Sequence, residues 1–120
     1  MNEIAHNHAA GDCTYGNCDP RLLADTAGIF KLLGHETRLS VLLLLAERPH
    51  SVSEIVTHLG ITQPMASQHL KNLRAGELVK GTKDGQTVRY ELADAHVAHI
   101  IKDAISHSRE KAGQPSEPAN

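Results

Sequence analysis

The chain has 120 residues, a formal net charge of −2 at neutral pH, nine histidines and two cysteines. At this length we expect one domain whose core is too small to be comfortably stable unless subunits pair, and two cysteines are too few for a disulfide scaffold. No apolar run is long enough to cross a bilayer and no signal segment is recognisable, so we expect a cytoplasmic protein with reduced cysteines and no membrane partner.

Residues 1–19 have the composition of a flexible arm, because Asn, Gly, Asp and His are common and apolar periodicity is absent. The arm carries His6, His8, Cys13 and Cys18, side chains that bind soft or borderline metals. The two cysteines are spaced more widely than in a zinc knuckle, so a mobile arm and a second metal or redox site are both open interpretations of this segment.

The first helix of the domain is predicted to begin at Asp19 and Pro20, which are typical of a helix cap and a first helical position. Apolar residues then recur every three or four positions until Gly34. A second helix follows, and its segment 39–45 is apolar almost all round, as in a buried central helix. By contrast, the composition of residues 111–120 predicts a disordered tail.

A helix-turn-helix candidate follows the central helix. Ser51 is predicted to cap a short helix that ends at Gly60, and Thr62 to cap a longer helix that tolerates Pro64 in its first turn. The outward face of the longer helix carries side chains that can hydrogen-bond base edges or neutralise phosphates, namely Gln63, Ser67, Gln68, Lys71 and Arg74. An ordinary polar helix face has a similar composition, so both interpretations stand at this point.

A hairpin follows, because residues 78–82 and 87–92 are strand-like runs joined by a turn that contains Asp-Gly. A helix-turn-helix followed by a basic-tipped hairpin predicts a winged helix, a mainly α fold with a β-hairpin wing. We expect Lys83 and Arg89 of the hairpin to lie on the DNA backbone or in the minor groove. Residues 63–90 contain five basic and two acidic side chains, a local charge of +3 in an acidic chain.

Residues 94–110 predict a last helix in which a stripe of metal-binding side chains lies beside an apolar stripe. Asp94 stands where a carboxylate caps the first turn. His96 and His107 are eleven positions apart, about 16 Å along a helix, whereas zinc reaches its ligands at about 2 Å. One helix therefore cannot hold an ion with both ends. Two copies that run antiparallel about a two-fold axis would bring Asp94 and His96 of one to His107 and Glu110 of the other.

The same stripe has other interpretations. It also contains His99 and Asp103, so it could be an intrahelical ladder through His99, Asp103 and His107, or a solvated polar face. A zinc enzyme is a further alternative, but catalytic zinc usually has three protein ligands and an open position for water. No nucleophile–base or phosphate-loop motif is found, so we expect neither enzymatic activity nor a small-molecule substrate.

Segments 33–39 (LGHETRL) and 68–73 (QHLKNL), followed by the turn at Gly85, resemble the ArsR/SmtB family of metal-responsive repressors. The resemblance covers residues 20–110, which we expect to form one DNA-binding and dimerisation domain. Family members with a sensor site on the last helix carry Asp-x-His, ten further residues, and then His-x-x-His or His-x-x-Glu. Residues 94–110 match this pattern completely, with Glu in the final place.

The resemblance implies a homodimer that binds a palindromic operator in double-stranded DNA and represses a metal efflux or sequestration gene. It further implies two intersubunit zinc sites, built from Asp94, His96, His107 and Glu110, and release of the operator when metal binds. Two imidazoles and two carboxylates suit Zn²⁺, with Co²⁺, Ni²⁺ and Cd²⁺ as alternatives, although a soft ion such as Cd²⁺ prefers thiolate.

One departure from the family pattern concerns the arm. Family members with a second, thiolate-rich site pair arm cysteines with cysteine at the start of the helix-turn-helix, where this chain has Ser51 and Ser53. Cys13 and Cys18 therefore lack their usual partners. A winged-helix repressor that responds through these two cysteines to a soft metal or to oxidation is the alternative function.

Overall fold

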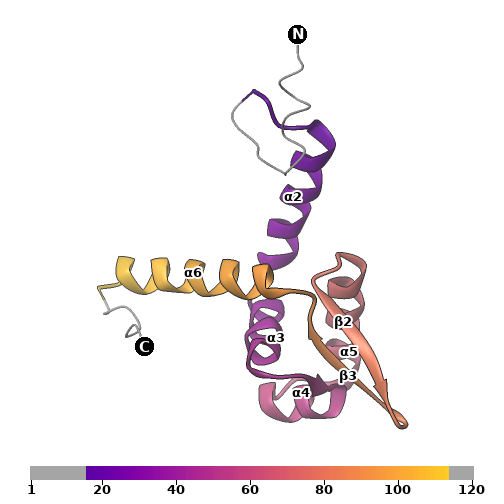
Figure 1. The fold of residues 1–120 in the computed structure, drawn as a ribbon. Helices are drawn as coiled ribbons and strands as arrows, with labels where there is room; N and C mark the ends of the chain where they lie inside the picture. The colour runs from indigo at the N-terminus through magenta and orange to yellow at the C-terminus, as the bar shows by residue number, and fades with distance from the viewer. Residues whose placement is uncertain (1–15, 114–120) are drawn as a thin grey trace.

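The computed structural model describes residues 16–113, which form five helices and three strands. In chain order the elements are α2 (Pro20–Leu33), α3 (Glu36–Glu47), β1 (His50–Ser51), α4 (Val52–Leu59), α5 (Gln63–Ala75), β2 (Val79–Asp84), β3 (Thr87–Leu92) and α6 (Ala95–Lys111). Figure 1 shows α2 and α6 extending away from the body formed by α3, α4, α5 and the sheet. None of these helices combines the length and the apolar character that crossing a lipid bilayer requires.

The helix boundaries follow the capping residues that the sequence predicts. Asp19 caps α2, and Thr62 caps α5 through its side-chain hydroxyl. At the start of α4, Ser51 and Glu54 form a reciprocal capping box that satisfies two backbone N–H groups. Gly60 ends α4 in the left-handed region with φ 67°, a conformation that costs other residues roughly 1–2 kcal/mol. The predicted helix-turn-helix is confirmed.

The wing is the antiparallel hairpin of β2 and β3, and β1 lies on the other side of β3. Asp84 pairs with Thr87, which leaves Gly85, at φ 68°, in the turn. β2 therefore runs further toward the tip than the predicted segment 78–82. The two-residue strand β1, in which His50 pairs with Tyr90, was not predicted, because so short a strand carries no periodic signal.

The core lies where α3, α4, α5 and the first turns of α6 meet. Its largest fully buried apolar side chains are Val41, Leu42, Ile55, Leu70, Leu73 and Ile101. α3 supplies Leu45 as well, so the predicted buried central helix is confirmed. β1 adds the buried His50, whose Nδ1 lies 2.7 Å from the carbonyl oxygen of Arg48.

The apolar side of α2 is largely uncovered in the single chain. Leu22, Leu23 and Phe30 are 41%, 59% and 57% exposed, and Leu33 is the one residue of this helix that is buried. Exposing several large apolar side chains on one helix is unfavourable in water, since each contributes up to about 1.5–3 kcal/mol when it is fully buried. This face of α2 has the properties of a surface that a partner covers.

Candidate nucleic-acid interface and metal-binding face

The longer helix of the helix-turn-helix, α5, has an inner and an outer side. Ala66, Leu70 and Leu73 are buried in the core. The five residues of α5 that are predicted to contact DNA are all exposed: Gln63, Ser67, Gln68, Lys71 and Arg74. The structure therefore brings them together on one helix, with base-reading amide and hydroxyl groups beside two cationic groups.

Two features next to this face were not anticipated from the sequence. The side-chain amide of Gln68 donates to Oδ1 of Asn72 at 3.2 Å, which orients Gln68 along the helix surface. Their i, i+4 spacing is a signal from which this pair could have been found. A shallow depression of about 400 Å³ lies beside the face, lined by Ser67, Lys71, Arg74 and, from β3, Tyr90. A phosphate group fits the charge of this depression.

The two wing residues predicted to contact DNA occupy different environments. Lys83 is exposed near the hairpin tip. Arg89 instead contacts carboxylates on both sides: its Nη1 lies 3.1 Å from Oε1 of Glu54 and its Nε lies 3.3 Å from Oδ2 of Asp84. The hydrogen bond from the Ser51 backbone and the charge of Arg89 lower the pKa of Glu54, and the charge of Glu54 raises the pKa of Arg89.

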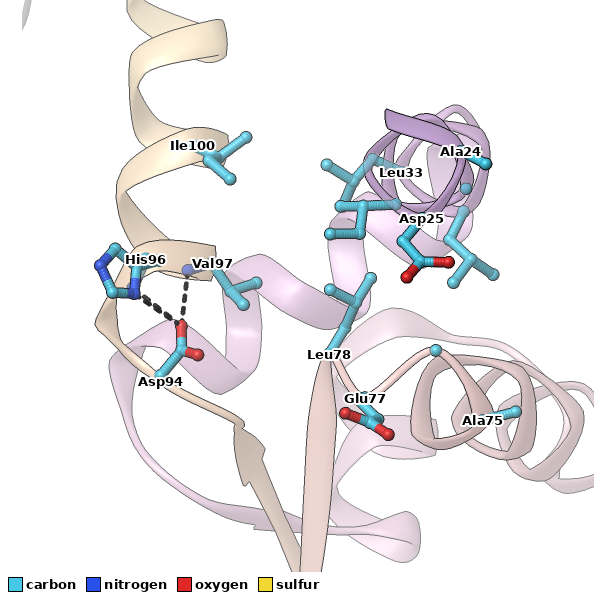
Figure 2. Close-up of a pocket in the computed structure, with 14 residues that line it drawn as sticks. Ala24, Asp25, Leu33, Ala75, Glu77, Leu78, Asp94, His96, Val97 and Ile100 are labelled. Carbon is cyan, nitrogen blue, oxygen red and sulfur yellow. Dashed lines mark hydrogen bonds and ion pairs between the residues drawn. The ribbon is translucent and has the colours of Figure 1, made fainter. Parts of the chain in front are cut away.

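The predicted metal-binding face lies on α6, which is one continuous helix. Asp94 caps it, accepting from the backbone N–H groups of His96 at 2.9 Å and Val97 at 3.3 Å. The Nδ1 atom of His96 lies 3.6 Å from the same carboxylate oxygen. Figure 2 shows this pair on the side of α6 that faces away from α2. Asp94 and His96 are therefore held together at the start of the helix.

The exposed and buried sides of α6 are opposite one another. Val97 and Ile101 are buried in the core of the same chain. The polar stripe is exposed along the whole helix and consists of His96, His99, Asp103, His107 and Glu110. The side chain of His96 is 91% exposed, so its imidazole is accessible to a ligand from outside the protomer.

The four predicted metal ligands lie in two pairs, at opposite ends of α6. His107 and Glu110 are in the last turns, about 16 Å and about 21 Å along the axis from His96. Within residues 16–113, no group of three or more His, Cys, Asp or Glu side chains is arranged to hold a metal ion. Each pair has donor atoms suited to zinc, but one described chain does not bring the two pairs together.

The predicted second site falls mostly outside the described part of the chain. His6, His8 and Cys13 are not among residues 16–113. Cys18 precedes α2, is half-buried and is disulfide-bonded, which differs from the expected reduced state. A disulfide sulfur is not a thiolate, so Cys18 in this state is not a strong metal ligand.

A cavity of about 590 Å³ lies between α2, α6 and the turn that follows α5 (Figure 2). Its apolar lining comes mainly from Ile29, Leu32, Leu33, Leu78, Val97 and Ile100. Asp25 and Glu77 add carboxylates at its edge, and Asp94 and His96 also border it. The cavity therefore lies between α2 and the start of α6.

Residues 35–80 match the family described as bacterial regulatory protein, arsR family. The transcriptional repressor SmtB of Mycobacterium tuberculosis is 40% identical over 112 residues, covering 89% of this chain and 83% of the relative.

Solved structures agree with the fold. The homodimeric winged helix-turn-helix domain Mb0332 of Mycobacterium bovis, a possible ArsR-family regulator, superimposes with a TM-score of 0.71 at 31% identity, covering 75% of this chain and 83% of that domain. M. tuberculosis Rv0081 gives a TM-score of 0.71 at 30% identity, covering 79% of this chain and 95% of that one. The predicted winged helix is thus confirmed.

Proposed function

The chain belongs to the ArsR family of bacterial regulatory proteins, which are transcriptional regulators and not enzymes, and on this premise we propose that it is a metal-sensing repressor. Its homodimer binds a palindromic operator and is released when zinc, or a related divalent ion, binds between the two C-terminal helices. Genes for metal efflux or sequestration would then be derepressed.

The observation that carries this proposal is the arrangement of α6. The ligand pairs Asp94–His96 and His107–Glu110 lie at opposite ends of an exposed stripe, while Val97 and Ile101 on the other side of the first turns are buried. Two such helices, antiparallel about a two-fold axis, place the first pair of one copy beside the second pair of the other. Each resulting site has two imidazoles and two carboxylates.

This set of donors fits zinc, which favours four nitrogen, sulfur or oxygen ligands in a tetrahedral arrangement. Co²⁺ accepts the same geometry, Ni²⁺ accepts imidazole and carboxylate, and Cd²⁺ prefers thiolates that these four residues do not supply. With all four positions taken by side chains, the site lacks the open position of a catalytic zinc. When bound, the ion would cross-link the two C-terminal helices.

The homodimer is supported by the surfaces that one chain leaves uncovered. Leu22, Leu23 and Phe30 of α2 are exposed, and the cavity beside α6 is lined largely by apolar side chains. A second copy of the chain would cover these surfaces, and we propose that the same interface brings the two α6 helices together.

The operator contact is supported by the outer side of α5. In a dimer, two such helices about one duplex turn apart would reach successive major grooves. Gln63, Ser67 and Gln68 would contact base edges, whereas Lys71 and Arg74 would neutralise phosphates. Lys83 at the wing tip would add a phosphate contact.

Zinc and operator must influence each other equally if they bind different arrangements of one dimer. The test is to titrate zinc into the metal-free protein, with and without a duplex that carries the chain's own promoter. We expect zinc to lower the affinity for this duplex, and the duplex to lower the affinity for zinc by the same factor. Equal zinc affinities in the two titrations would contradict the proposal.

A second candidate is a response to oxidation or to a soft metal through Cys13 and Cys18, and the disulfide at Cys18 favours the response to oxidation. In this case the Cys13→Ser/Cys18→Ser double variant would lose the response. A double variant that is released from the promoter by zinc as readily as the wild type would exclude this candidate.

A further inference from the structure

Arg89 joins the wing to the helix-turn-helix through an ion pair that spans 35 positions of sequence. Its Nη1 lies 3.1 Å from Oε1 of Glu54, in the first turn of α4, and its Nε lies 3.3 Å from Oδ2 of Asp84, on the neighbouring strand β2. Arg48 adds a weaker contact, with Nη1 3.9 Å from the same oxygen of Glu54. The guanidinium of Arg89 therefore contacts carboxylates from two different elements, α4 and β2.

The Glu54 carboxylate is itself held in place. Its Oε1 accepts from the backbone N–H of Ser51 at 3.1 Å, while Oγ of Ser51 accepts from the backbone N–H of Glu54 at 3.2 Å. Ser51 also pairs with Arg89 in the β1–β3 ladder. Ser51, Glu54 and Arg89 thus form a closed connection between the start of α4 and the middle of β3.

We propose that Arg89 is a positioning residue for operator binding: it sets the orientation of the wing relative to α4 and α5 and does not contact a phosphate. This inference rests on the proposed function. Arg89 faces two carboxylates, Glu54 and Asp84, and with Arg48, whose Nη1 lies 3.9 Å from Glu54, the four side chains together carry no net charge. Such a group does not attract a phosphate, whereas the exposed Lys83 does.

The test compares operator affinity over a range of salt concentrations for four full-length proteins: the wild type, two matched single variants and their double variant. Glu54→Gln removes the charge that holds Arg89, yet glutamine preserves the capping box with Ser51. Arg89→Gln removes the cation. We expect both variants to bind the promoter duplex more weakly by a similar factor, and the double variant to be no weaker than Arg89→Gln.

The salt dependence separates positioning from direct contact. Each phosphate contact contributes about 0.9 to the slope of log affinity against log salt concentration. We expect Arg89→Gln and Glu54→Gln to leave this slope unchanged, and Lys83→Gln to reduce it. A reduced slope for Arg89→Gln, together with tighter binding by Glu54→Gln, would overturn the proposal, because the freed guanidinium would then be a phosphate ligand.

A readout without DNA distinguishes failure of this inference from failure of the proposed function. Urea unfolding of the four proteins forms a double-mutant cycle for Glu54 and Arg89. A coupling between the two substitutions supports the connection even if the wild type binds no duplex, a result that would contradict only the proposed function. Additive effects of the two substitutions would overturn the positioning role.

Discussion

The imidazole rings of His35 and His69 lie with their centroids 4.8 Å apart, which joins the start of α3 to the middle of α5. Nδ1 of His35 accepts from the backbone N–H of Thr37 and so caps α3. Nδ1 of His69 is buried and has no hydrogen-bond partner within the described part of the chain. Burial lowers the pKa of His69, and the charges of His35 and Arg38 lower it further.

This lowered pKa makes stability depend on pH. Above the ordinary value of 6.5 the ring is neutral in both the folded and the unfolded chain, so its contribution is fully present there. As the pH falls below 6.5 the unfolded chain binds the proton first, and stability is lost until the pH passes the folded-state pKa. When the pH is lowered from about 7.5 to about 5.5, we expect the free energy of unfolding to fall less for His69→Gln than for the wild type. Urea unfolding in metal-free buffer measures this, with His99→Gln, on the exposed side of α6, as the control that follows the wild type.

Asp94 is predicted to have two separable roles, as the cap of α6 and as a metal ligand. Asp94→Ala removes the acceptor for the N–H groups of His96 and Val97 and is expected to cost about 1 kcal/mol of stability in metal-free protein. Asp94→Asn keeps a good cap and should cost only a few tenths. Both should bind zinc more weakly, because neither supplies a carboxylate. Zinc affinity of Asp94→Asn equal to that of the wild type would leave Asp94 as a cap alone.

Mixed dimers test whether the metal sites lie between subunits. His96→Gln and His107→Gln homodimers each lack one ligand in both sites, and we expect weak zinc binding by each. A mixed dimer of the two has both losses in one site and a complete second site, so mixing should restore one tight zinc site per mixed dimer. Competition with a chelator measures the recovered sites.

Mixing His96→Gln with Asp94→Asn is the matched control, because both substitutions lie in the same half of the site and every site in that mixed dimer still lacks a ligand. No tight binding should return. If the His96→Gln and His107→Gln mixture also fails to recover, an intersubunit site built from both histidines is contradicted.

Lys71 is predicted to neutralise a phosphate from the exposed side of α5. Lys71→Gln should weaken binding to all duplex sequences similarly and reduce the slope of log affinity against log salt concentration by about 0.9 per protomer. Fluorescence titrations with the promoter and with an unrelated duplex measure both quantities. The control is Lys102→Gln, since Lys102 is also exposed but lies on α6, and this variant should have the slope of the wild type. An unchanged slope for Lys71→Gln would show that Lys71 does not contact a phosphate.

Local signals in the sequence were sufficient to predict most of the helices and the wing. Caps at Asp19, Ser51 and Thr62 act within one helical turn, and the Asp-Gly turn at Gly85 acts within one hairpin, so each can be recognised without tertiary information. The length of α6 likewise follows from its periodicity.

Other features depend on contacts between distant residues and could not be predicted. The ion pair of Arg89 with Glu54 exists only because β1 brings the start of α4 beside β3. The apolar residues of α2, Leu23 and Phe30 among them, have the same sequence pattern whether they face their own core or a partner. The first-turn Glu54 could have been recognised from the Ser-x-x-Glu spacing, although not its contact with Arg89.

The opposite faces of α6 have a mechanical consequence. Val97 and Ile101 fix the rotation of this helix about its own axis, because turning it would draw both side chains out of the core. The imidazoles on the other face therefore cannot adjust to an ion by rotating the helix alone. In the proposed dimer, a displacement that a bound ion demands would therefore pass to the body of each protomer, which carries α5. The buried side chains of α6 would thus couple the coordination of an ion to the distance between the two α5 helices.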